Sequence, residues 1–190
     1  MPSALRDTRP GLHHVWCRGN NKRAIVLDDH DRLDLLMRIG RAAASSGWGI
    51  VAYCVMDNHY HLVLEIGERG MSPGLCRVHT GYATSFNERH ARVNHLFGRR
   101  FGSRPIEDAD DLFATCRYVL LNPVRAGVAS VVDDYEWSSY RATVGIAAPA
   151  VPLDACVLLD SFHIRRTRAE ELFAEFCGSV HPRLRVEPAA

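Results

Sequence analysis

The chain has 190 residues, enough for one domain, and 47% of them are hydrophobic, which suffices for a sizeable core. No apolar run reaches the ~18 residues of a membrane span and no apolar signal region opens the chain, so we expect a cytoplasmic protein without a membrane partner. A net charge of +1 and six scattered cysteines without a Cys-x-x-Cys pair argue against a strongly basic binding protein and a zinc knuckle.

Hydrophobic periodicity and turn residues predict an alternation of strands and helices. The predicted elements are a strand at 12–18, a helix at 29–44, strands at 50–56 and 60–65, a helix at 72–92, a fourth strand within 99–106 and a helix at 108–122. The order β-α-β-β-α-β-α predicts an α+β protein, a ferredoxin-like sandwich with an added C-terminal helix.

The composition changes after Tyr140, where residues 145–152 are rich in Ala and Pro. We therefore expect a main domain at 1–145, followed by a linker and a small helical C-terminal extension at 146–190. The chain has no Gly-rich phosphate loop, so we expect no nucleotide cofactor.

His59 and His61 form the most informative pattern, a His-Tyr-His tripeptide with apolar, β-branched flanks that predict a strand. Positions i and i+2 of a strand point to one face, so the two imidazoles would stand side by side while Tyr60 points away. Neighbouring neutral imidazoles make a good metal pair. The alternative is two surface histidines beside a turn.

Tyr118 and Asn122 lie four residues apart on the helix predicted at 108–122, and therefore on one face. A phenol and a carboxamide in this arrangement are a plausible nucleophile and metal ligand. The alternative is an amphipathic helix with Tyr118 half buried and Asn122 as its C-terminal cap, because the residue before Pro123 resists the helical region.

Basic residues gather between these two elements, although the chain as a whole is nearly neutral. The guanidinium fork of arginine suits phosphates and guanine edges, so this stretch is a candidate for contact with nucleic acid. The alternative is a solvated basic loop. The stretch contains no acidic residue, and its arginines are Arg89, Arg92, Arg99, Arg100 and Arg104.

Six segments in series resemble the HUH single-tyrosine transposases, close to the REP-associated tyrosine transposases. They lie at 14–20, 55–61, 86–89, 95–101, 117–127 and 135–140, within residues 10 to 145. Two departures are Asn94-His95, where Gly-His is usual, and His13-His14, where the first strand usually starts with an aromatic residue. The resemblance implies Tyr118 as the nucleophile on a catalytic helix, His59 and His61 as metal ligands, and Asn122 as a polar third ligand.

The resemblance implies a metal-dependent endonuclease and strand transferase that nicks single-stranded DNA near hairpins through a covalent 5′-phosphotyrosine. A free phenol titrates near pH ~10, so the nucleophile needs assistance. Mg²⁺ or Mn²⁺ is the implied cofactor, and two imidazoles with one amide favour Mn²⁺ in affinity. The implied partner is single-stranded or hairpin DNA, bound by a monomer or homodimer. The predicted DNA-binding residues are Arg18 and Asn20 together with the five arginines above.

Two other functions use the same residues. A DNA-hairpin-binding protein without catalysis would keep the basic surface alone. A His-metal hydrolase acting on a small substrate would need a nearby carboxylate, and Glu65 is the only local one. A covalent protein–DNA adduct separates the three.

Overall fold

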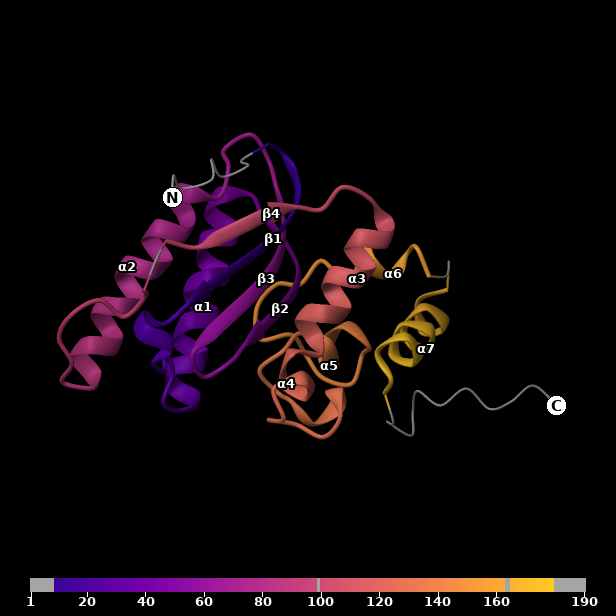
Figure 1. Ribbon diagram of the computed structural model, residues 1–190. Helices are drawn as coiled ribbons and strands as arrows, with labels where there is room; N and C mark the ends of the chain where they lie inside the picture. The colour runs from indigo at the N-terminus through magenta and orange to yellow at the C-terminus, as the bar shows by residue number, and fades with distance from the viewer. Residues whose placement is uncertain (1–8, 99, 163–164, 180–190) are drawn as a thin grey trace.

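A four-stranded antiparallel sheet forms the centre of the molecule (Figure 1). The structure, a computed structural model, describes residues 9–98, 100–162 and 165–179. The strand order is β2-β3-β1-β4, so β3 and β1 are the two inner strands. The α+β class predicted from the sequence is confirmed. The strands are β1 (Gly11–Arg18), β2 (Gly49–Val55), β3 (His59–Ile66) and β4 (Gly102–Pro105).

Helices cover both faces of the sheet, with α1 and α2 on one side and α3 with the C-terminal helices on the other (Figure 1). None of the helices in the described ranges has the length and apolar character of a membrane span. The larger helices are α1 (Asp29–Ser46), α2 (Ser72–Arg89), α3 (Ala109–Leu120) and α7 (Arg166–Cys177). The short ones are η1 (Asn20–Lys22), α4 (Asn122–Arg125), η2 (Val132–Asp134), α5 (Tyr140–Thr143) and α6 (Cys156–Leu159).

Strand alternation divides the sheet side chains between two apolar cores. On β3, Tyr60, Leu62 and Leu64 pack with α1 and α2, whereas Val63 packs with α3. The alternate residues of each strand therefore face α3. On that face β1 and β3 present polar side chains instead of completing the core. This polar area is where the candidate site lies.

Most predicted boundaries differ from the observed ones by one to three residues. The helix α2 ends at Arg89, not at residue 92, and β4 is shorter than the predicted segment.

The C-terminal residues also pack more closely than an appendage would. Phe173 and Cys177 of α7 belong to the same buried cluster as Cys116 and Val119 of α3, so α7 supports α3. The division of the chain at 145 remains a prediction.

Burial of His79 on α2 predicts an acid-sensitive fold. Its Nε2 lies 2.6 Å from the Tyr60 hydroxyl, and burial lowers its pKa to about 4. Below about pH 6.5 the unfolded chain binds a proton at this position and the folded chain does not, so stability falls from pH 6.5 towards 4 and then levels off. Between about pH 7 and 4.5, the unfolding free energy of His79→Gln should fall by about 2 kcal/mol less than that of the wild type. Urea unfolding at the two pH values measures this, and equal losses would contradict it.

Candidate active site

A cleft of about 790 Å³ lies on the polar area of the sheet, between β1, β3 and the end of α3. The register places Trp16 opposite His61 and Arg18 opposite His59, so β1 and β3 form one continuous floor. The side chains of α3 and α4 form the opposite wall. The described residues that line the cleft include no carboxylate; they are His14, Trp16, Cys17, Arg18, His59, His61, Arg104, Tyr118, Asn122, Arg125 and Ala126.

His59 is held with one ring nitrogen open to the cleft. Asn58 donates its side-chain amide to the Lys22 carbonyl, which turns Asn58 Oδ1 towards His59 Nδ1 at 2.6 Å. The Nδ1 of His59 therefore carries the proton, because a carbonyl oxygen can only accept. In the neutral ring Nε2 then keeps its lone pair, and burial lowers the His59 pKa and favours this neutral form.

The unprotonated His59 Nε2 faces Asn122 Oδ1 at a distance of 3.0 Å. Two acceptors at this distance have no hydrogen between them. Their contact is favourable only when a proton or a cation lies between them. About 3 Å is also the separation of two adjacent ligands of a cation with bonds near 2.1 Å. The donor set therefore fits a small divalent cation.

His61 presents a second imidazole to the same space. Its ring lies at a right angle to that of His59, with centroids 5.1 Å apart, so the prediction that the two rings share one face is confirmed. Its Nδ1 lies 2.9 Å from His14 Nε2, which leaves its Nε2 without a hydrogen-bond partner among the described residues. Burial lowers the pKa of His61 to about 3 and that of His14 to about 4, so both rings are neutral near pH 7.

Tyr118 reaches this cluster from α3 of the same chain. Its ring centroid lies 5.5 Å from that of His61 in an edge contact, and the side chain is 38% exposed. The Arg125 guanidinium carbon stands 5.1 Å from the centre of the phenol ring. A cation at that distance is attracted to the ring and would also attract a phosphate beside it.

The prediction that Tyr118 and Asn122 share one helix is wrong. The helix α3 ends at Leu120, and Asn122 begins the separate short helix α4 with Pro123 next to it. Leu121 between them has φ −86° and ψ 3°, outside the regular helix. Pro123 has no N–H to donate to the Val119 carbonyl, so the regular helix does not continue through this turn. Asn122 is nevertheless buried, and its Oδ1 lies 3.0 Å from His59 Nε2.

Side-chain hydrogen bonds between β4 and α3 tie the helix that carries Tyr118 to the sheet. Arg104 donates two hydrogen bonds to the Asp111 carboxylate, at 2.7 and 2.8 Å, and one to Thr115 Oγ1 at 2.6 Å. The guanidinium lowers the pKa of Asp111 to about 2. Bidentate pairs of this kind restrict geometry as well as contribute energy. Arg104 lines the cleft, but much of its charge is compensated by this partner.

The other predicted DNA-binding residues fall into two groups. Arg18, Asn20 and Arg100 line a hollow of about 490 Å³ that adjoins the cleft. Arg89 instead pairs with Asp28 and Asp31, and Arg92 lies over the Phe86 ring with a hydrogen bond to the Ala24 carbonyl; neither lines the cleft. Arg99 lies outside the described residues. DNA contact by these residues remains a prediction.

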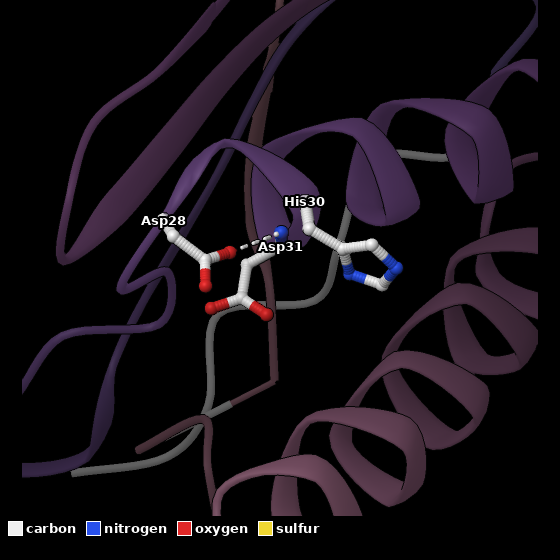
Figure 2. A group of neighbouring side chains, drawn as sticks. All are labelled: Asp28, His30 and Asp31. Atoms are coloured by element: carbon white, nitrogen blue, oxygen red, sulfur yellow. Dashed lines mark hydrogen bonds between the residues drawn. The ribbon is translucent and has the colours of Figure 1, made fainter.

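A second group of potential cation ligands, Asp28, His30 and Asp31, stands at the start of α1 (Figure 2). Its carboxylates already have donors. Asp28 caps the helix by accepting from Asp31 N and also accepts from Arg89, while Asp31 accepts from Leu27 N, His90 and Arg89. The group is therefore accounted for as a helix start tied to α2.

His14 and Arg125 are among the cleft residues to which the sequence assigned no role. His14 stood only as a departure from the usual first strand, and Arg125 as one letter of a longer motif. The available signal for His14 was its place two residues before Trp16 and four before Arg18 on one predicted strand, which puts all three on one face. No signal indicated that α4 would bring Arg125 over the phenol.

Comparisons with known proteins identify the family of the chain. Residues 9–121, which include β1 to α3, match the family described as "Transposase IS200 like". A Haemophilus influenzae protein named "Putative REP-associated tyrosine transposase" is 27% identical over 105 residues, covering 50% of this chain and 60% of that relative. A solved structure of a REP-associated tyrosine transposase bound to a REP hairpin superposes with a TM-score of 0.65 at 19% identity, covering 82% of this chain and 96% of that one, and shares the fold. The chain belongs to the IS200-like transposase family.

Proposed function

We propose that this protein is a DNA-nicking and strand-transferring enzyme that attacks a phosphodiester of single-stranded DNA with the phenol oxygen of Tyr118. The observation that carries the proposal is the convergence of Tyr118, His59, His61 and Asn122 on one carboxylate-free cleft within a single chain. Family membership supports the same reaction. A hydrolase acting on a small substrate would need an acid or base carboxylate, and Glu65 lies outside the described cleft lining.

The reaction follows from what each side chain offers. The phenol of Tyr118 loses its proton and its oxygen bonds to phosphorus, while the bond from phosphorus to the 3′ oxygen breaks and that oxygen takes up a proton. The products are a 5′-phosphotyrosine and a free 3′-hydroxyl. Arg125 beside the phenol ring stabilises negative charge on the phosphate and the attacking oxygen.

The donor atoms available for a divalent cation are His59 Nε2, His61 Nε2 and Asn122 Oδ1. A bound Mg²⁺ or Mn²⁺ would supply Lewis-acid polarisation of the phosphate oxygen. Asn58 and His14 hold the two ligating rings by their other nitrogens, the usual arrangement behind histidine ligands. The proposed substrate is a single strand next to a hairpin, as suggested by the relative that was solved with one.

We also infer that the sheet and helices form a ferredoxin-like sandwich. The element order β-α-β-β-α-β and the strand order β2-β3-β1-β4 support this arrangement. In it the first and third strands lie side by side at the centre. That neighbourhood is what puts the His pair of β3 beside His14 of β1.

A hairpin-bearing single strand, labelled at either its 5′ or its 3′ end, tests the proposal. With Mn²⁺ or Mg²⁺ the 3′ label should migrate with the protein on a denaturing gel, while the 5′ label appears on a shorter strand with a free 3′-hydroxyl. Cleavage with no label on the protein would favour the metal hydrolase instead. Retention of intact strand without any cleavage would favour the DNA-hairpin-binding alternative.

Removal of His14 should lower the affinity for the metal ion while the protein remains folded. His14→Ala frees the His61 ring to rotate, and loss of such a supporting partner commonly lowers metal affinity by about 10- to 100-fold. His14→Gln, whose amide can still bond to His61 Nδ1, should recover part of this loss. Calorimetric titration of Mn²⁺ into the DNA-free protein measures the effect, and unchanged affinity in His14→Ala would exclude a supporting role.

A further inference from the structure

Trp16 is a large aromatic side chain that the apolar cores do not use. It lies on the inner strand β1, where strand alternation turns it to the cleft side together with His14 and Arg18. Trp16 is 36% exposed, whereas Tyr53 on β2 and Tyr60 on β3 are buried. An indole left partly open to water in the wall of a polar cleft indicates a surface available for a ligand.

The backbone of β4 holds the indole in place. Trp16 pairs with Gly102 across the strands, and a Cβ at Gly102 would overlap the indole, lying only 2.5 Å from Cζ2. Only glycine permits the ring to lie against this strand. The His14 ring, at 5.0 Å between centroids, packs on it as well. The indole is thus a supported aromatic surface that borders the open space of the cleft.

Trp16 also lines two hollows. One is the cleft with Tyr118, and the other is the hollow of about 490 Å³ at the end of β1, which shares Trp16, Cys17 and Arg18 with the cleft. This second hollow carries the cationic side chains of Arg18, Lys22 and Arg100, and its described lining includes no carboxylate. None of these three cations has a carboxylate partner among the ion pairs of the described residues, in contrast to Arg89 and Arg104. The charges are therefore available for phosphates.

We propose that Trp16 is the stacking platform for a nucleobase of the single strand next to the phosphate that Tyr118 attacks, and that the strand continues into the hollow lined by Arg18, Lys22 and Arg100. An aromatic surface flanked by cations along a groove is how proteins hold single-stranded nucleic acid with little dependence on sequence. The inference rests on the proposed function for its location beside the scissile phosphate. Its ligand class, an unpaired base with adjoining phosphates, rests on Trp16 and the three cations.

The test compares two probes that carry equal charge, a short fluorescein-labelled oligodeoxythymidylate and an abasic strand of the same length. Binding is measured by fluorescence anisotropy in the Tyr118→Phe background without metal, so that no cleavage interferes. We expect Trp16→Ala to weaken binding of the oligothymidylate by about 10-fold and to leave the abasic strand unaffected, because stacking needs a base. Trp16→Phe should retain most of the affinity.

Two further variants separate stacking from charge and from misfolding. Gly102→Ala forces the indole to shift and should reproduce the base-dependent loss of Trp16→Ala without removing the ring. Arg18→Ala combined with Arg100→Ala should weaken both probes alike and flatten the salt dependence by about 0.7 for each phosphate that the protein no longer neutralises. Leu33→Ala, an exposed apolar residue on α1, serves as the matched control and should bind both probes as the parent does.

Equal binding of both probes by the Tyr118→Phe parent, or an unchanged affinity of Trp16→Ala for oligothymidylate, would overturn the stacking platform. A parallel loss for both probes in Trp16→Ala would overturn it too, since that pattern belongs to a damaged fold. These outcomes do not depend on catalysis. A wild-type protein that shows base-dependent binding but forms no adduct would refute the proposed nicking reaction and leave the platform standing.

Discussion

Tyr118→Phe should abolish strand cleavage, by at least about 1,000-fold, while DNA binding stays within about 2-fold of the wild type. The substitution removes the phenol oxygen and keeps the ring that contacts His61 and Arg125. Stability should change little because the side chain is 38% exposed and its hydroxyl has no hydrogen bond among the described residues. Cleavage rates under single-turnover conditions and anisotropy with the same strand measure the two quantities.

The control for this prediction is Tyr82→Phe, which removes a phenol oxygen at a distance from the cleft. Tyr82 donates its hydroxyl to the Ile25 carbonyl at 2.6 Å inside the core. That variant should lose about 1 kcal/mol of unfolding free energy and keep its cleavage rate. A Tyr118→Phe protein that still nicks at near wild-type rate would require another nucleophile.

His61→Ala should remove metal-dependent cleavage without unfolding the protein. The ring supplies one of the proposed ligand atoms, so its loss should lower cation affinity by more than the roughly 10- to 100-fold that the loss of a partner behind a ligand costs. His59→Ala is expected to act similarly, since its Nε2 faces Asn122 Oδ1. Mn²⁺ binding to the DNA-free protein and the metal concentration for half-maximal cleavage report the effect.

Thermal unfolding in metal-free buffer is the companion measurement. His79→Ala, which removes a half-buried imidazole bonded to Tyr60 on the opposite face of the sheet, is the matched control and should reduce stability without affecting metal affinity. If His61→Ala or His59→Ala loses as much stability as His79→Ala and binds Mn²⁺ normally, the histidines have a packing role. The proposed ligand set would then be wrong.

Local periodicity was sufficient to predict the histidine pair. Alternation along a strand puts His59 and His61 on one face and Tyr60 on the other, whatever the strand packs against. The two strands that pair as the β2–β3 hairpin could likewise be predicted, because the turn residues Asp57 and Asn58 stand between two apolar runs. Features fixed within a few residues of chain could be predicted.

Features that depend on distant partners could not. The arginine stretch was interpreted as one basic surface, but Arg89 pairs with Asp28 and Asp31, which lie about sixty positions earlier. Nor does the sequence reveal the pairing of β1 with β3 that sets His14 beside His61. Asn122 was expected near His59 through a helical register that Pro123 interrupts, and the position arises from the turn into α4 instead.

The most direct test of the account is to identify the amino acid that carries the DNA. The adduct formed with Mn²⁺ and a hairpin-bearing single strand is digested with nuclease and protease, and the modified peptide is sequenced by mass spectrometry. The account predicts a nucleotide joined through its 5′ phosphate to Tyr118. Attachment to any other residue, or a strand cut with no peptide modified, would contradict it.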